Sequence, residues 1–133
     1  MKIEEKVFTN MWNEEMFIEE IENRYAYVMM SKNQIMAYIC GWMIYDQFDI
    51  TNIAVLPEFQ RKGYGSCLIN FLISKLLNEK CYKFFLEVRE SNLAAISFYK
   101  NLGFKYLGTR NSYYISPVED AMIFAADFQN ITH

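Results

Sequence analysis

The stretch QRKGYGSCLINFLI, residues 60–73, separates two segments with different hydrophobic patterns and so decides the fold. Residues 48–55 (FDITNIAV), before it, are rich in β-branched side chains and predict a strand. After the two glycines, apolar residues recur at helical spacing and predict a helix over about 63–78. Residues 83–88 (KFFLEV) are a nearly continuous apolar run, which is typical of a strand inside a covered sheet. Strand, helix and strand in this order predict a βαβ unit with two parallel strands.

Hairpins are predicted before this unit. Residues 25–31 and 34–45 have the pattern of two strands around a Lys32-Asn33 turn, and Asp46-Gln47 forms a second tight turn. Gly41 inside the longer strand marks a bulge. Further upstream, Asn13 is followed by EEMFIEEIENR, which predicts a capped helix over residues 14–24. Trp12 and Trp42 are expected in the core.

After the unit, the pattern predicts one more helix and one more hairpin. Ser91 or Asn92 caps a helix that ends at Leu102, and Gly103 follows it. Two last strands cover residues 104–114 and 120–128. The fold class is therefore mixed α/β, with a mainly antiparallel sheet and one parallel βαβ unit.

Length, charge and composition exclude several classes of protein. The 133 residues predict one domain, residues 1–133, and 53% hydrophobic content supplies its core. The net charge of −3 predicts no nucleic-acid partner, and residues 35–45, an uncharged apolar stretch, are too short to cross a membrane. Three cysteines, an odd number, favour a reducing compartment and hence a cytoplasmic protein. His133 is the only histidine, so no metal site is expected.

The glycine turn is a candidate anion site. A turn between a strand and a helix presents backbone N–H groups at the positive end of the helix dipole, and Arg61 and Lys62 add positive charge. The spacing fits neither GxGxxG nor GxxxxGK[ST], so a dinucleotide or nucleoside-triphosphate loop is not indicated. The residues alone leave two interpretations: a pyrophosphate site, or glycines that only let the chain turn tightly.

The order of motifs adds a family resemblance. QRKGYGS after IAVLPEF resembles the Q/R-x-x-G-x-G/A motif of the GNAT superfamily of N-acetyltransferases, which holds the pyrophosphate of coenzyme A. LEVRESN, AISFYKNLGF and RNSYYISPVEDAMIF follow at family spacing and resemble most closely the bacterial ribosomal-protein-alanine N-acetyltransferase subfamily, over residues 48–128. The resemblance implies the GNAT fold and acetyl-CoA as co-substrate. The subfamily's opening strand and first helix are missing or much reduced here, because about ten residues precede Trp12.

The resemblance also implies which residues contact acetyl-CoA. Backbone groups of three strand residues would meet the pantetheine arm: Ile53, Ala54 and Val55. Asn92 would contact the same arm. The turn and the start of the helix would line the pyrophosphate, with Arg61, Lys62, Gly63, Tyr64, Gly65 and Ser66.

Two residues are candidates for proton transfer. Glu87 interrupts an apolar strand near its C-terminal end, and the residues alone allow a general base or an ion pair with Arg89. Tyr99 belongs to an apolar helix stripe with Ala95 and Leu102, which predicts core packing. By resemblance, Glu87 is the base and Tyr99 the acid that protonates the coenzyme A sulfur. One tyrosine can fill both roles, because only its hydroxyl must reach the site.

The acceptor is less closely defined. Two interpretations of Tyr113 and Tyr114 stand equally: they grip the backbone of a substrate N-terminus, or they are aromatics at a sheet edge. An α-amine with a pKa of about 8 is roughly a quarter neutral near neutral pH, whereas a lysine is about 0.1% neutral. The leading hypothesis is thus acetylation of a protein N-terminal alanine, with a ribosomal protein as partner, by a monomer or homodimer. The alternatives are a small-molecule amine or lysine acceptor, or a non-catalytic acyl-CoA-binding module.

Overall fold

The sheet dominates the architecture. A computed structural model describes residues 4–8, 15–21, 24–31 and 34–129. Within these ranges eight strands form one sheet in the order β1-β2-β3-β4-β5-β6-β8-β7. The strands are β1 Glu4–Phe8, β2 Glu15–Ile21, β3 Arg24–Ser31, β4 Gln34–Ile44, β5 Gln47–Val55, β6 Lys83–Arg89, β7 Lys105–Ile115 and β8 Val118–Asp127. The helices are the 3-10 turn η1 Pro57–Phe59, α1 Tyr64–Asn78 and α2 Leu93–Asn101.

Strand directions agree with the predicted fold class. β5 and β6 are parallel and are joined through α1, whereas the other neighbours in the described sheet are antiparallel. The mixed α/β sheet with one parallel βαβ unit is therefore confirmed. Neither of the two α-helices in the described ranges has the length and apolar character that crossing a membrane requires.

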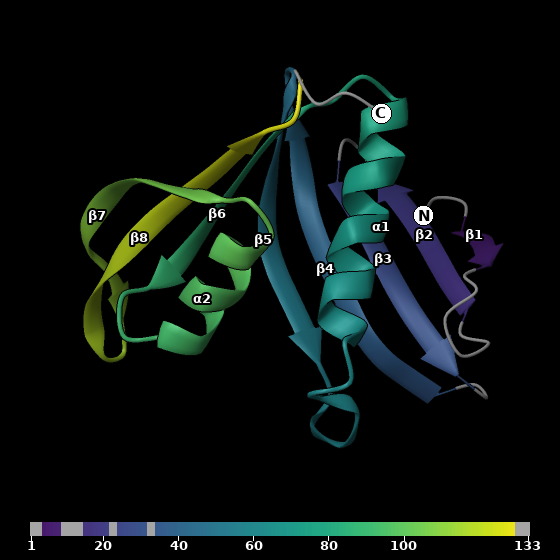
Figure 1. Cartoon of the computed structure of the whole chain (residues 1–133), viewed down its shortest axis with the longest axis horizontal. Coiled ribbons are helices and arrows are strands. Elements are labelled where there is room, and N and C mark those ends of the chain that lie inside the picture. Colours follow the sequence, from purple (N-terminus) through teal and green to yellow (C-terminus); the bar gives the residue numbers. More distant parts are fainter. Residues whose placement is uncertain (1–3, 9–14, 22–23, 32–33, 130–133) are drawn as a thin grey trace.

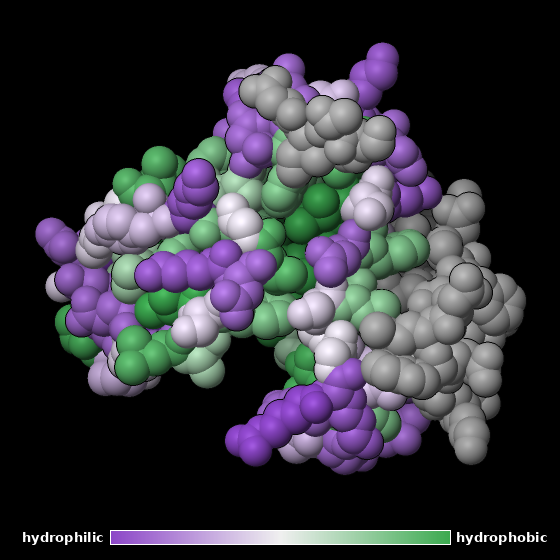
Figure 2. Space-filling model, viewed as in Figure 1, coloured by the Kyte–Doolittle hydropathy of each residue, from purple (hydrophilic) through white to green (hydrophobic). Residues whose placement is uncertain are grey.

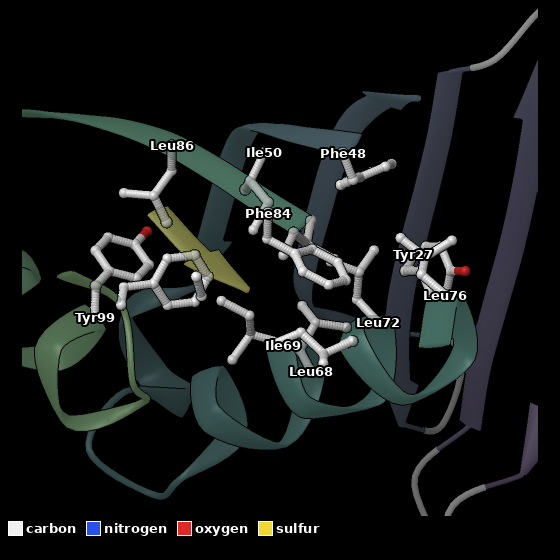
Figure 3. Packing of buried hydrophobic residues seen from close by; sticks show 14 of the residues in the cluster. Tyr27, Phe48, Ile50, Leu68, Ile69, Leu72, Leu76, Phe84, Leu86 and Tyr99 are labelled. Carbon is white, nitrogen blue, oxygen red and sulfur yellow. The ribbon is translucent and has the colours of Figure 1, made fainter. Parts of the chain in front are cut away.

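Both α-helices lie on the same face of the sheet (Figure 1). α1 buries Leu68, Ile69 and Leu72 against Phe48 and Phe84 of the parallel strands (Figure 3). Each fully buried leucine or isoleucine side chain contributes about 1.5–3 kcal/mol relative to an exposed one. Because strand side chains alternate, the neighbours of these buried residues point to the opposite, helix-free face.

The two parallel strands, β5 and β6, separate halfway along β5. They pair only over Gln47–Ile50 and Lys83–Leu86. Beyond Ile50, β5 stays with β4 as far as Val55, while β6 stays with β8 as far as Arg89. The sheet therefore opens into a V between the C-terminal ends of β5 and β6 (Figure 1).

Local signals at two predicted positions are confirmed. The register of β4 and β5 shifts between Cys40 and Gly41, so Gly41 marks a bulge. A Cβ at Gly41 would overlap the carbonyl oxygen of Asp49, which explains the glycine. Asn92 caps α2, since its Oδ1 accepts a hydrogen bond from the Ala95 N–H at 3.2 Å.

The helix predicted over residues 14–24 is wrong. Glu15–Ile21 forms β2, which pairs with β3 on one side and β1 on the other. A short segment that mixes apolar and acidic residues fits both periods, and an isolated helix of this length gains little stability by itself. The edge of β3 supplies the backbone partners that select the strand.

Two smaller predictions also need correction. Trp42 is 42% exposed on the helix-free face, with the Arg24 guanidinium 5.7 Å from its ring centroid, so it is not a core residue. The turn between β4 and β5 is Tyr45-Asp46 rather than Asp46-Gln47, and Tyr45 takes a positive φ of 55°. Trp12, Asn13, the Lys32-Asn33 turn and His133 lie outside the described residues.

Candidate functional site

Two cavities meet where the sheet opens. The helix-side cavity, about 270 Å³, lies between β5, β6 and α2 and is lined in part by Asn52, Ile53, Asn92 and Tyr99. The open-face cavity, about 490 Å³, lies among β5, β6 and β7 and includes Asp49, Arg110 and Tyr113. Both are lined by the same five residues: Ile50, Thr51, Leu86, Glu87 and Tyr114. Ligands entering from the two sides would thus meet at Glu87.

Glu87 lies near the end of β6, on the boundary between the two cavities. Its side chain is 27% exposed, and the Arg110 Nε lies 2.6 Å from its Oε2. The alternative partner Arg89 is wrong, because Arg89 instead contacts Glu119, at 3.2 Å. Glu87 therefore presents a carboxylate that is anchored by a guanidinium and lines both cavities.

Tyr99 is both a core residue and a cavity residue. The residue is 7% exposed, and its ring packs edge-on against Phe98 and Phe104. Its hydroxyl end points from α2 towards the strand that carries Leu86, which lines the same cavity (Figure 3). Burial, and to a smaller extent Tyr114, raises the pKa of Tyr99 to about 12. The phenol is therefore protonated and can donate a hydrogen bond throughout the physiological pH range.

The glycine turn leads into α1 with a left-handed backbone. Arg61 and Gly63 have φ values of 65° and 84°, and Gly63 is the N-cap, without a side chain to cap the first turn. The first turn of α1 holds no acidic residue, and Arg61 and Lys62 are exposed beside it. The positive end of the helix dipole, the two cations and the lack of an acid in the first turn of α1 together suit a phosphate-bearing ligand.

The side chains of this turn contribute unequally. Tyr64 is buried against Phe59, so only its backbone can face a ligand. A Cβ on Gly65 would lie 3.5 Å from the Phe98 ring, which places the start of α1 next to α2. Ser66 lies in the first turn of α1 and is half-buried. In Figure 2 a notch lies between α2 and this hydrophilic turn, so a ligand can reach the helix-side cavity past both.

The predicted pantetheine residues flank this notch. Ile53, Ala54 and Val55 lie in the part of β5 that pairs with β4 but has left β6. Ile53 and Asn92 line the helix-side cavity. The structure therefore brings Ile53 and the α2 cap to one cavity, and Ala54 and Val55 continue β5 from there towards the turn.

Tyr113 and Tyr114 lie in the open-face cavity beside Glu87 because β7 is irregular there. The β7–β8 register shifts between Arg110 and Tyr114, and Ser112 takes a φ of 52°. The negative charge of Glu87 is the main cause that raises the pKa of Tyr113. The Arg89 guanidinium lies 4.1 Å from the centroid of the Tyr114 ring. Tyr113 is thus coupled electrostatically to the Glu87 carboxylate, and Arg89 holds the Tyr114 ring at the wall of the same cavity.

Three residues of the site were missed from the sequence. Gln60, read only as a motif letter, donates from Nε2 to the Val55 carbonyl at 2.8 Å and ties the turn to the end of β5. Arg110 is 23 positions from Glu87, and no local pattern foretells their contact. Asp49 fits the alternation of polar and apolar residues along the predicted strand, but it belongs to no motif that would have marked it as a site residue.

Comparisons with known proteins show which protein family the chain belongs to. Residues 1–104 match the model of the family described as the Acetyltransferase (GNAT) family. The [ribosomal protein bS18]-alanine N-acetyltransferase of Escherichia coli (strain K12) is 35% identical over 126 residues, covering 92% of this chain and 85% of that protein.

Solved structures agree. The ribosomal-protein-S18-alanine N-acetyltransferase from Escherichia coli matches with a TM-score of 0.76 and 32% identity, over 86% of this chain and 77% of that one. A GNAT family acetyltransferase from Elizabethkingia anophelis with acetyl-CoA bound has the same fold, with a TM-score of 0.73 and 20% identity over 79% and 76% of the two chains.

Proposed function

Since the chain belongs to the acetyltransferase (GNAT) family and is an N-acetyltransferase, we propose that it transfers the acetyl group of acetyl-CoA to the N-terminal α-amine of a protein, an alanine of a ribosomal protein in particular. The observation that carries the proposal is the junction of two cavities at Glu87. The names of the relatives at 32% and 35% identity support the alanine acceptor.

Acetyl-CoA would enter through the helix-side cavity. Its pyrophosphate would lie at the start of α1, against the N–H groups of Gly65 and Ser66 and the cations of Arg61 and Lys62. The pantetheine arm would follow β5 past Ile53, Ala54 and Val55, where no β6 partner occupies the strand edge. The thioester would then stop between Glu87 and Tyr99.

The acceptor would enter from the opposite face. Its α-amine would reach Glu87 through the open-face cavity, with Tyr113 and Tyr114 against the first peptide units. Glu87 would accept a proton from the amine, whose nitrogen attacks the thioester carbonyl carbon. The new C–N bond forms, the C–S bond breaks, and the Tyr99 hydroxyl gives its proton to the departing sulfur. Glu87 then releases the proton of the amine to solvent, and Tyr99 takes up a proton from solvent. The net products are an N-acetylated chain and coenzyme A.

The first test measures coenzyme A release from acetyl-CoA with four peptides. Three carry a free N-terminal alanine, serine or methionine, and the fourth has a blocked N-terminus and an internal lysine. We expect rapid release with N-terminal alanine only. Release with the lysine peptide alone would indicate a lysine acceptor. Tight acetyl-CoA binding without release from any peptide would contradict the proposal and favour a small-molecule amine or a non-catalytic module.

The role of Glu87 has a matched control. Glu87→Gln keeps the shape of the side chain but removes the proton acceptor, and we expect kcat with the alanine peptide to fall about a hundredfold or more. Glu90→Gln makes the same change at an exposed position directly after β6 and is expected to retain activity. Equal rates for the two variants would exclude Glu87 as the base.

A further inference from the structure

The β5 wall of the open-face cavity carries an acid that the proposed reaction does not use. Asp49 lies directly opposite Trp42 on β4 and Phe85 on β6, and it lines the cavity with Glu87 and Arg110. Among the described residues, its carboxylate accepts one side-chain hydrogen bond, from Gln47 Nε2 at 3.4 Å, and forms no ion pair. Asp49 therefore brings a half-buried negative charge into the cavity without a cation to balance it.

The cations around Asp49 are engaged elsewhere. Arg110, on the β7 side of the cavity, holds Glu87 at 2.6 Å. Lys83 pairs with Asp46 at 3.6 Å, and Arg24 stacks on the Trp42 ring at 5.7 Å. The cavity thus has a guanidinium already paired on its β7 wall and an unbalanced carboxylate on its β5 wall.

The distance between Asp49 and Glu87 matches one residue of a bound peptide. Glu87 is two positions beyond the residue opposite Asp49, so strand spacings of about 4.8 Å and 3.3 Å per residue separate their Cα atoms by about 8 Å. With the α-amine of the acceptor at Glu87, a long side chain on the second residue spans this distance.

We propose that Asp49 is a specificity-determining residue, which selects acceptors with lysine or arginine directly after the N-terminal residue. The assignment rests on the proposed function, because it takes Glu87 as the position of the α-amine. Trp42 supports it, because its partly exposed ring lies beside Asp49 and offers an apolar flank to the stem of a lysine or arginine. An acidic second residue would meet Asp49 with like charge.

The expected selectivity is modest, because the pair is partly exposed to solvent. Ion pairs of this kind are worth about 0.2–1 kcal/mol, and the like-charge pair costs a similar amount. We therefore expect kcat/KM to favour an arginine peptide over a neutral one about threefold, and over an acidic one about tenfold.

The experiment compares three peptides that differ only at the second residue: Ala-Arg, Ala-Gln and Ala-Glu. In Asp49→Asn the Arg-to-Glu ratio of kcat/KM should fall to within about twofold, and in Asp49→Lys it should invert. The far-UV circular dichroism and the thermal midpoint of Asp49→Asn should match those of the wild type, which shows that the variant is folded. Asp46→Asn removes the same charge from the neighbouring turn and should keep the wild-type ratio.

Salt gives a readout that a purely structural role would not change. At 0.5 M salt, where the Debye length is only about 4–5 Å, the wild-type ratio should shrink towards that of Asp49→Asn. Equal wild-type turnover of all three peptides, or an unchanged ratio in Asp49→Asn, would overturn the Asp49 assignment and leave the proposed function standing. Absence of turnover with every peptide would overturn the proposed function, and this assignment with it.

Discussion

At the scale of single residues, Tyr99 belongs both to the core and to the candidate site. Its ring packs against Phe98 and Phe104 in the core, while its hydroxyl lies at the helix-side cavity. The helix pattern predicted core packing for Tyr99, and the family resemblance added proton donation, which the same residue can combine with packing. The structure supports the packing directly, and it places the hydroxyl where the proposed donation would need it.

The raised pKa of Tyr99 predicts a loss of stability at alkaline pH. Below about pH 10 the phenol is neutral in both the folded and the unfolded chain, so its contribution is fully present. As pH rises from 10 towards the folded-state pKa of about 12, only the unfolded state ionises, and the free energy of unfolding falls by about 2 kcal/mol. Urea denaturation of the wild type and of Tyr99→Phe between pH 8 and 11.5 measures the difference. An identical pH dependence of the two proteins would contradict the assignment.

At the scale of secondary-structure elements, the turn before α1 is held by its backbone. Gly63→Ala forces a Cβ onto a residue with a φ of 84°, although no atom lies near enough to clash. We expect a cost of about 1–2 kcal/mol in the free energy of unfolding from strain alone. We also expect KM for acetyl-CoA to rise several-fold, because the N–H groups at the start of α1 shift.

Gly108→Ala is the control for this prediction. Gly108 also has open space around it but no positive φ, so the same substitution should leave both quantities nearly unchanged. Equal effects of the two substitutions on KM would show that the turn does not act through its backbone geometry.

Elements whose pattern is long and regular were predictable, and short mixed ones were not. α1 has an apolar stripe over four turns and a glycine start, so its bounds followed from the sequence almost to the residue. Residues 15–21 carry too few apolar positions to separate the two periods, and the neighbouring strand decided their conformation. Trp42 was misplaced for a related reason, since hydrophobicity does not tell which face of a sheet is covered.

At the scale of the whole molecule, the site depends on strands that are distant in sequence. The motifs predicted Glu87, Tyr99 and the turn, because each motif is local. The partnership of Glu87 with Arg110 needs the sheet order β6-β8-β7 and an irregular β7, neither of which has a local signal. The position of Asp49 in the same cavity likewise follows from the β5–β6 pairing.

Acetyl-CoA should stabilise the fold, because its predicted contacts bridge α1, β5 and α2. At a concentration of 100 times Kd, the free energy of unfolding should rise by about 2.7 kcal/mol. For a domain of this size that corresponds to a Tm increase of roughly 10 °C, measurable by differential scanning calorimetry. Acetyl phosphate, which lacks the pantetheine arm, is the control and should leave Tm unchanged. A constant Tm up to millimolar acetyl-CoA would contradict binding at this opening.

The separation of β5 and β6 has a consequence for the order in which the substrates bind and react. With an entrance on each face of the sheet, neither substrate blocks the path of the other, and donor and acceptor can be present together. We therefore expect the acetyl group to pass directly from donor to acceptor in a ternary complex, without a covalent acetyl-enzyme intermediate. Initial rates measured over both substrate concentrations should accordingly give intersecting rather than parallel double-reciprocal lines. Each product can leave through the same cavity by which its substrate entered.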